Sequence, residues 1–361
     1  MSKRLRIWLF VLLGTLLTSS SLLAEGVITM TTSQWVGETI KLKIEASGNV
    51  TIEGAQETGE TDDYGRKSYT IKSQTITIRG DVTTLKCSYN QLTSLNLSGC
   101  TALTTLKCYD NQLTALDVSQ NTALTRLDCY DNQLTALDVS QNTALTRLDC
   151  YRNQLTALDV SQNAALTELK CTNNQLTALD VSKNTKLGTL DCQQNQLTAL
   201  DVSQNTALTK LVCAENKLSA LDVSQNTALK IFACGENPLT ALDVSQNIAL
   251  TQLICDNNQL SALDVSQNTA LKWLDCDNNQ LTALDVSKNT ALRTLECFIN
   301  KLTALDVSQN IALTELYCYR NQLTALDVSK NTKLEALRCH GNQIKGKEMT
   351  RLVRDLSETK K

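Results

Sequence analysis

The chain contains a single histidine, His340, and none of its serines or cysteines has a second sequence feature that indicates a neighbouring base. Nucleophilic catalysis requires a nucleophile, a base and an orienting group within hydrogen-bond reach of one another. The sequence therefore predicts that the protein is not an enzyme, and it indicates neither a catalytic residue nor a cofactor.

An excess of positive charge is also missing. The chain carries 34 Lys and Arg against 37 Asp and Glu, and three of the basic residues, Lys3, Arg4 and Arg6, lie at its start. Without these three, 34 − 3 = 31 basic residues remain and the net charge becomes −6. Nucleic acids are bound through clustered Lys and Arg side chains, so a nucleic acid is not an expected partner.

Only one long apolar run is present, at residues 7–17, between the three basic residues and small residues that end at Ala24. This is the pattern of a secretory signal peptide, and the run is shorter than the ~20 residues of a membrane-spanning helix. We expect residues 1–24 to be a signal peptide and the mature protein to be secreted or displayed on the cell surface, without a membrane span. A retained membrane anchor is the alternative reading of this segment.

One unit of 21 residues fills most of the remaining chain. Its clearest copy, LTTLKCYDNQLTALDVSQNTA at residues 103–123, places Leu106 and Cys108 on either side of Lys107. This alternation predicts a short strand with two inward-facing side chains, which pairs in parallel with the same segment of the next turn. A fixed period of this length predicts a solenoid, here of thirteen repeats over residues 82–344. The repeats are marked by Cys87, Cys108, Cys129, Cys150, Cys171, Cys192, Cys213, Cys234, Cys255, Cys276, Cys297, Cys318 and Cys339.

Fourteen cysteines in an exported chain would ordinarily suggest disulfides. Parallel neighbours are ~4.8 Å apart, however, whereas a disulfide brings its Cβ atoms to ~3.8 Å. We therefore predict a ladder of reduced thiols that pack as small apolar groups, and no metal site, because the cysteines occur singly along the chain. Cys100, the only cysteine out of phase, is the candidate for a reactive thiol.

An asparagine follows each predicted strand, where the bending backbone needs hydrogen-bond partners. We interpret these residues as a structural ladder, and we expect Asn121 and its equivalents to act similarly at the second bend. The ladder comprises Asn90, Asn111, Asn132, Asn153, Asn174, Asn195, Asn216, Asn237, Asn258, Asn279, Asn300, Asn321 and Asn342.

A file of aspartates recurs in the second half of the unit from Asp117 to Asp327. We expect their carboxylates to accept hydrogen bonds from nearby backbone N–H groups or hydroxyls. A row of cation sites is the alternative, although one aspartate per turn supplies few of the 6 to 8 oxygens that calcium takes.

The flanks of the repeat follow other patterns. Residues 25–81 form a β-rich module with predicted strands at 39–45, 49–53, 68–71 and 75–78, and a loop at 54–67. Apolar residues 71, 76 and 82 continue the 21-residue spacing backwards, which predicts a degenerate half-turn of the solenoid. We expect the module to cover the open end of the stack, with a separate binding role as the alternative. In the tail, residues 345–361, Met349, Leu352, Val353 and Leu356 recur at helical spacing and predict a capping helix.

The unit LxxLxCxxNxL followed by LxxLxVxxNxx resembles a leucine-rich repeat, which implies an α/β solenoid, mostly parallel β with a short irregular convex side. The Asn-Gln-Leu-Thr after the strand is similar to the repeats of internalin-like surface proteins of bacteria, in a variant with one cysteine per repeat. The resemblance covers residues 82–344. For function it implies only a class, proteins that display a curved sheet for adhesion to host or neighbouring-cell molecules, often in virulence.

Differences between the copies concentrate at the third, fifth, seventh and eighth positions of the unit, represented by Thr105, Lys107, Tyr109 and Asp110. These are the outward-facing strand positions and the residues just after them. The exposed second half of the unit hardly changes. Diversification of one binding face accounts for this contrast, and a packing constraint on the convex side is the alternative.

Two patches on the variable face combine aromatic and Arg side chains, which are the usual anchors of interfaces. In the first, three tyrosines should stack along the strand edge, and an acidic stretch separates this patch from the second. The predicted ligand-binding residues are Tyr109, Asp110, Arg126, Tyr130, Asp131, Arg147, Tyr151, Arg152, Trp273, Phe298, Ile299, Tyr317, Tyr319 and Arg320. The sequence thus predicts a secreted or surface-exposed, monomeric binding protein for a protein or glycan of a host or neighbouring cell. The alternative is a structural envelope spacer without a specific ligand.

Overall fold

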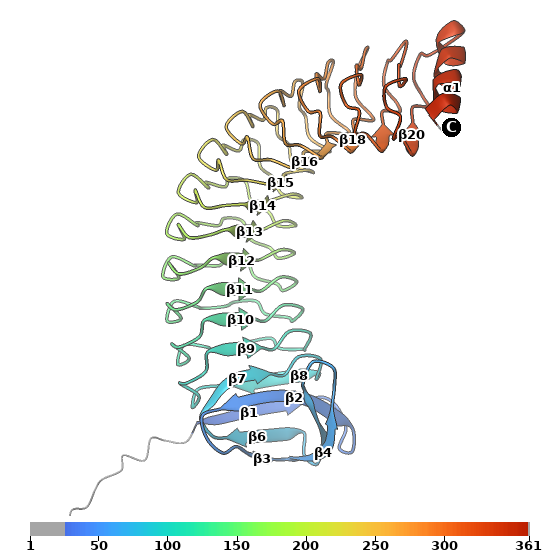
Figure 1. The fold of residues 1–361 in the computed structure, drawn as a ribbon. Helices are drawn as coiled ribbons and strands as arrows, with labels where there is room; N and C mark the ends of the chain where they lie inside the picture. The colour runs from blue at the N-terminus through green and yellow to red at the C-terminus, as the bar shows by residue number, and fades with distance from the viewer. Residues whose placement is uncertain (1–25, 360–361) are drawn as a thin grey trace, which may run out of the picture.

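The computed structural model describes residues 26–359, so the predicted signal peptide lies outside the described residues. The chain forms a curved stack of turns with a β-rich cap at one end and a helix at the other (Figure 1). The short strands of the stack lie along the inner side of the arc, as the C-terminal turns in Figure 1 show most clearly. The predicted α/β solenoid of leucine-rich repeat type, mostly parallel β, is confirmed.

The stack begins with β7 (Val82–Lys86) and continues with one strand of three residues in each later turn. Neighbouring strands pair in parallel with residues 21 apart, for example Leu106 with Leu127. The later strands are β9 (Thr105–Lys107), β10 (Arg126–Asp128), β11 (Arg147–Asp149), β12 (Glu168–Lys170), β13 (Thr189–Asp191), β14 (Lys210–Val212), β15 (Ile231–Ala233), β16 (Gln252–Ile254), β17 (Trp273–Asp275), β18 (Thr294–Glu296), β19 (Glu315–Tyr317) and β20 (Ala336–Arg338).

The core runs through the stack as files of identical side chains. Leu106 and Cys108 are fully buried, whereas Lys107 between them is half-buried, as the alternation predicts. Leu113 and Val118, from the irregular second half of the unit, are also fully buried and belong to the same core. Because each turn supplies the same apolar set, every turn can bury its neighbour's open face.

The cap contains β1 (Val27–Thr32), β2 (Thr39–Ala46), β3 (Thr51–Glu53), β4 (Ala55–Thr61), β5 (Lys67–Ile71) and β6 (Thr75–Arg79). β2 pairs antiparallel with β7, which places β2, β5 and β4 at the end of the long solenoid sheet. A second sheet has the order β3-β6-β1-β8, where β8 is Leu92–Asn96 of the first repeat. Both sheets therefore cover strand edges that would otherwise be open at the first turn.

Two predictions for the cap were wrong, and one strand was missed. The expected loop at 54–67 contains β4, an edge strand that is exposed along almost its whole length and so shows no apolar alternation. β1 was missed as a strand. β6 does not start a half-turn of the solenoid, because β1 lies between β6 and β8 and pairs antiparallel with both.

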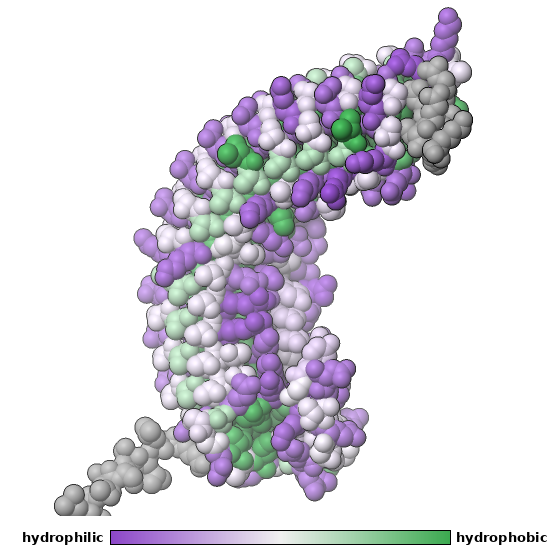
Figure 2. Space-filling model, in the orientation of Figure 1, coloured by the Kyte–Doolittle hydropathy of each residue, from purple (hydrophilic) through white to green (hydrophobic). Residues whose placement is uncertain are grey.

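Figure 2 shows an apolar patch on the cap and hydrophilic residues along the same side of the first turns.

The C-terminal helix α1 (Lys347–Thr359) follows the last turn. Leu352 is buried, but Met349 and Val353, which were expected on the same packed face, are exposed. Arg351 forms an ion pair with Asp327, which attaches the helix to the preceding turn. Within the described part of the chain, no helix has the length and apolar character required to cross a membrane.

Candidate functional site

The bend after each strand is built by the asparagine ladder. Asn111 donates from Nδ2 to the carbonyl oxygens of Cys108, at 2.9 Å, and of Cys87 in the preceding turn, at 3.1 Å. Equivalent bonds recur along the stack. Asn90 has no preceding turn, and its Nδ2 donates to the Lys41 carbonyl of β2 in the cap instead. These bonds place the variable residues before the bend at the same height in every turn.

The eighth position of the unit has a left-handed backbone. The φ angle is 56° at Asp110, 50° at Asp131, 50° at Arg152 and 52° at Arg320. Residues other than glycine, asparagine and aspartate adopt this region rarely, and a β-branched residue such as Ile299, at 50°, does so at a cost. The predicted residues at this position therefore occupy one backbone conformation with different side chains.

Three predicted tyrosines form a stack at the strand ends. The ring centroids of Tyr109 and Tyr130 are 4.2 Å apart with an interplanar angle of 9°, and those of Tyr130 and Tyr151 are 4.3 Å apart at 10°. Tyr89, which the sequence analysis did not select, meets Tyr109 edge to face at 5.3 Å. Arg152 lies over the far end, 5.9 Å from the Tyr151 centroid. We call Tyr89, Tyr109, Tyr130 and Tyr151 the tyrosine row.

Burial among neighbouring rings raises the pKa of Tyr130, first through desolvation and then through Tyr109 and Tyr151. The hydroxyl of Tyr130 therefore stays protonated at physiological pH. Tyr130 thus offers a hydroxyl that can both donate and accept at the edge of an apolar stack.

Arg126 and Arg147, also predicted, lie in the turns that carry Tyr130 and Tyr151, and carboxylates that the sequence analysis did not select hold them in place. Asp128, only 2% exposed, accepts from Arg126 Nη2 at 2.7 Å and from Arg147 Nε at 3.3 Å. Arg147 also forms ion pairs with Asp149, at 3.2 Å, and with Glu168. Because a bidentate or shared carboxylate restricts a guanidinium, these arginines present fixed rather than mobile charges to the concave face.

The second predicted patch is divided by the structure. Phe298 and Tyr319 stack at 4.3 Å and 10°, and Tyr319 stacks on His340 at 4.7 Å and 7°. His340 thus belongs to the patch. Its place at the seventh position of the unit could have indicated this from the sequence. Tyr317 lies on the strand itself, where its hydroxyl donates to Glu315 at 3.1 Å. Trp273 is the first residue of β17, at the third position of the unit, and is 39% exposed.

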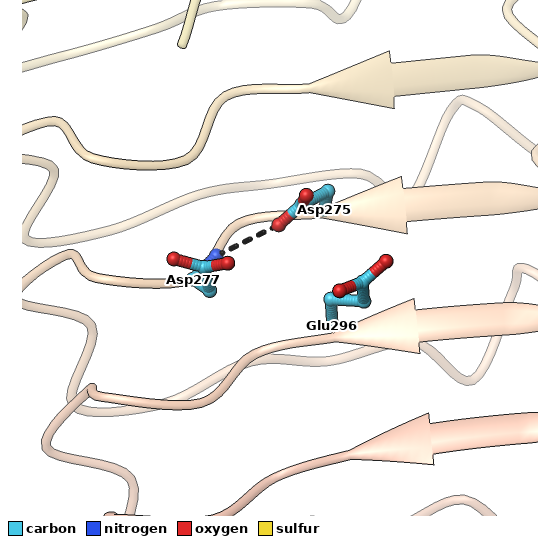
Figure 3. Close-up of side chains that lie close together, drawn as sticks. All are labelled: Asp275, Asp277 and Glu296. Atoms are coloured by element: carbon cyan, nitrogen blue, oxygen red, sulfur yellow. Dashed lines mark hydrogen bonds between the residues drawn. The ribbon is translucent and has the colours of Figure 1, made fainter. Parts of the chain in front are cut away.

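Between the patches, Asp275, Asp277 and Glu296 bring carboxylate oxygens within 4.8 Å of one another (Figure 3). Asp277 is 7% exposed, and its backbone N–H donates to Asp275 Oδ1 at 3.3 Å. No ion pair with Lys or Arg forms here among the described residues, in contrast to Asp128. Burial, followed by repulsion from nearby carboxylates, raises the pKa of all three carboxyls; Asp256 acts on each of them. The trio could supply oxygen ligands to a hard cation, for which the sequence analysis had considered only cysteines and the aspartate file.

The aspartate file makes the expected hydrogen bonds. Oδ1 of Asp117 accepts from the Ser119 N–H at 2.9 Å, and the bond recurs through to Asp327. This bond is the main reason that the pKa of Asp117 lies below its ordinary value. The file is thus satisfied locally in the second half of the unit.

The described cysteines are unpaired thiols, and all but Cys339 are buried. Burial raises the pKa of Cys108 well above its ordinary value, which suppresses the reactive thiolate. Cys100 does not fit the expected reactive thiol, because it is 1% exposed and donates to the Val82 carbonyl at 3.2 Å.

The chain was compared with protein families, curated proteins and solved structures. No family model and no curated protein sequence matches the chain. Among solved structures, the functional domain of InlJ from Listeria monocytogenes, described as including a cysteine ladder, is 47% identical, with a TM-score of 0.71. The match covers 71% of this chain and 58% of the InlJ domain. The chain is an internalin-like leucine-rich repeat protein.

This internalin-like protein is also similar to other solved leucine-rich repeat structures. LIC12759 from Leptospira interrogans is 26% identical over 76% of this chain and 82% of its own, with a TM-score of 0.66. The internalin InlF from Listeria monocytogenes, at 23% identity over 75% and 84% of the two chains, shows the same fold with a TM-score of 0.69. InlJ and LIC12759, which are more than 25% identical, support a repeat protein that serves protein interaction.

Proposed function

We propose that this internalin-like protein is exported and displays its concave strand face to bind a protein on the surface of a host or neighbouring cell. The tyrosine row carries the proposal. Three of its rings come from the variable seventh position of successive turns, and they stack at 4.2 and 4.3 Å. Aromatic and Arg side chains that are already ordered lose little conformational entropy on binding, which is why they anchor interfaces.

The distribution of charge supports the same face. Arg126, Arg147 and Arg152 lie in the same turns as Tyr130 and Tyr151, and each is paired with a carboxylate. A partner that meets this surface finds apolar ring edges flanked by fixed charges of both signs. Such a pattern gives orientation and specificity in addition to contact area. The aspartate file in the second half of the unit instead satisfies itself and varies little between copies.

The test replaces Tyr109, Tyr130 and Tyr151 together by alanine in the mature chain and measures binding to proteins extracted from host and neighbouring-cell surfaces. We expect saturable binding by the parent protein and a loss of at least about 100-fold, which corresponds to ~2.7 kcal/mol, in the variant. The matched control replaces Gln120, Gln141 and Gln162, exposed in the second half of the same turns, by alanine.

The control should bind like the parent protein, and circular dichroism should show the same fold in all three proteins. Unchanged affinity of the tyrosine variant would remove the assignment of this face. If the parent protein captures nothing saturable from either surface, the alternative of an envelope spacer without a specific ligand replaces the binding function.

A further inference from the structure

A cavity of about 400 Å³ lies where the cap meets the first two turns of the stack. Its volume falls within the range of about 300–1,000 Å³ that is usual for small-molecule sites. One side comes from the turn between β4 and β5, and the other from β7, β9 and the bends that follow them. The main lining residues are Tyr64, Arg66, Lys86, Tyr89, Lys107 and Tyr109.

Arg66 fixes the cap turn over the first repeat. Its Nε donates to Asp62 Oδ2 at 2.9 Å, and its Nη1 donates to the Ser88 carbonyl at 3.2 Å. The guanidinium carbon lies 5.7 Å from the Tyr64 ring centroid and 5.6 Å from that of Tyr89, within the range of cation–π contacts. The cap thus adds a ring and a cation to the near end of the tyrosine row, and the cavity is bounded by ordered side chains.

The cavity contains a cation that the protein does not neutralise. Lys107 pairs with Asp128 at 3.4 Å, but the described residues provide Lys86 with no ion pair. Glu45, the acidic residue that acts on Lys86, is already paired with Lys43 at 3.1 Å. Burial, followed by the nearby cations Lys43 and Lys107, lowers the pKa of Lys86. A bound anion would relieve this repulsion.

We propose that this pocket binds one acidic sugar residue, a hexuronic acid, with its carboxylate on Lys86 and its ring against the exposed tyrosines. Tyr64 is 77% exposed and Tyr89 is 55% exposed, so both offer ring surface and hydroxyl groups at the cavity. A lone carboxylate side chain would fill only a small part of the volume, whereas a pyranose ring with several hydroxyls matches both the size and the mixed lining. The assignment rests on the proposed function in one respect, because it assumes that the ligand of the concave face carries the sugar.

The experiment titrates the mature chain with D-glucuronic acid and follows binding by saturation-transfer NMR. D-Glucose tests the ring without the charge, inorganic phosphate tests the charge alone, and N-acetylglutamate amide tests a protein-like carboxylate. We expect saturable binding of glucuronic acid that weakens with added salt, and affinities at least about tenfold lower for the other three probes. Equal binding of the glutamate derivative would overturn the proposal in favour of an acidic protein segment, and equal binding of phosphate would show a non-selective anion site.

Two substitutions locate the sugar. Lys86→Gln removes the unpaired cation and Tyr64→Ala removes an exposed ring, and each should weaken glucuronic acid binding by about tenfold. Lys170→Gln is the matched control. Lys170, in β12, occupies the same position of the 21-residue unit as Lys86, is also half-buried, and lies outside the cavity. Retained binding in Lys86→Gln, with an unchanged melting temperature, would refute the assignment.

The failure of this proposal can be told apart from failure of the proposed function. Tyr130 and Tyr151 do not line the cavity. Their replacement by alanine should reduce binding of the cell-surface partner and leave the glucuronic acid affinity unchanged. If the tyrosine row binds its partner but the pocket binds no sugar, only the sugar proposal is wrong. If the pocket binds glucuronic acid but the tyrosine variants keep their partner affinity, only the assignment of the tyrosine row is wrong.

Discussion

The Tyr109 and Tyr130 rings lie 4.2 Å apart at an interplanar angle of 9°, although the two residues are one full turn of the solenoid apart in sequence. The spacing follows from the parallel pairing of β9 with β10, because equivalent residues of neighbouring turns stand side by side. A repeated aromatic residue at the seventh position is therefore converted into a continuous surface.

The stacking of the tyrosine rings predicts that their replacement by alanine destabilises the protein by unequal amounts. Tyr130 has a stacked ring on each side, whereas Tyr151 has one ring and the Arg152 guanidinium. Since an aromatic pair contributes about 0.5–1.5 kcal/mol beyond burial, we expect Tyr130→Ala to lower the free energy of unfolding by about 1 kcal/mol more than Tyr151→Ala. Urea denaturation of the two variants measures the difference. Equal costs would mean that ring stacking does not contribute to stability here.

The acidic trio predicts a pH dependence of stability. The unfolded chain ionises these carboxyls near pH 4, but in the folded protein burial raises the pKa of Asp275 and Asp277. The folded state then binds more protons than the unfolded state above pH ~4, so the free energy of unfolding falls as the pH rises through the raised pKa values. Melting temperatures measured from pH 4 to 9 should decline over this window.

Asp277→Asn should flatten that decline, because it removes a buried carboxyl whose ionisation is unfavourable. Asp264→Asn is the control, since Asp264 belongs to the exposed aspartate file and its pKa is lowered by the Ser266 N–H. A pH profile of Asp277→Asn that superimposes on that of the parent protein would contradict the account.

Backbone strain predicts a stabilising substitution at Ile299. This β-branched residue has a φ of 50°, where neighbouring turns use residues such as Asn278 at 45°. We expect Ile299→Asn to raise the free energy of unfolding by about 1 kcal/mol, the lower end of the cost of such strain. Ile248→Asn, at a residue that is 62% exposed and has no positive φ, should change stability little in the same denaturant titration. A loss of stability in Ile299→Asn would show that its apolar contacts outweigh the strain.

The thiols predict a selective labelling pattern. Burial raises the pKa of Cys339 and of the more deeply buried cysteines, but Cys339 alone among the described cysteines is partly exposed. Iodoacetamide at mildly alkaline pH should therefore modify Cys339 first in the folded protein, and the ladder from Cys87 to Cys318 only after unfolding. Mass spectrometry of the labelled chain reads the order. Early labelling of Cys100 in the native protein would restore it as a reactive thiol.

The sequence by itself determined the coil. Its period, its inward Leu and Cys residues and its asparagines recur in every copy, so one unit predicts the next, and the stacking of Tyr109, Tyr130 and Tyr151 follows from register alone. In a solenoid each turn contacts only its neighbours, so the contacts between turns can be predicted from the spacing of the repeat.

Tertiary structure alone decided the features without a period. β1 lies between β6 and β8, β4 forms an exposed edge, and Tyr64 and Arg66 reach across to Tyr89. The partners of Arg147 and the closeness of the acidic trio likewise depend on side-chain directions in adjacent turns. These contacts join residues that share no repeating pattern, so the chain order carries no signal of them, and only the folded geometry brings their charges and rings together.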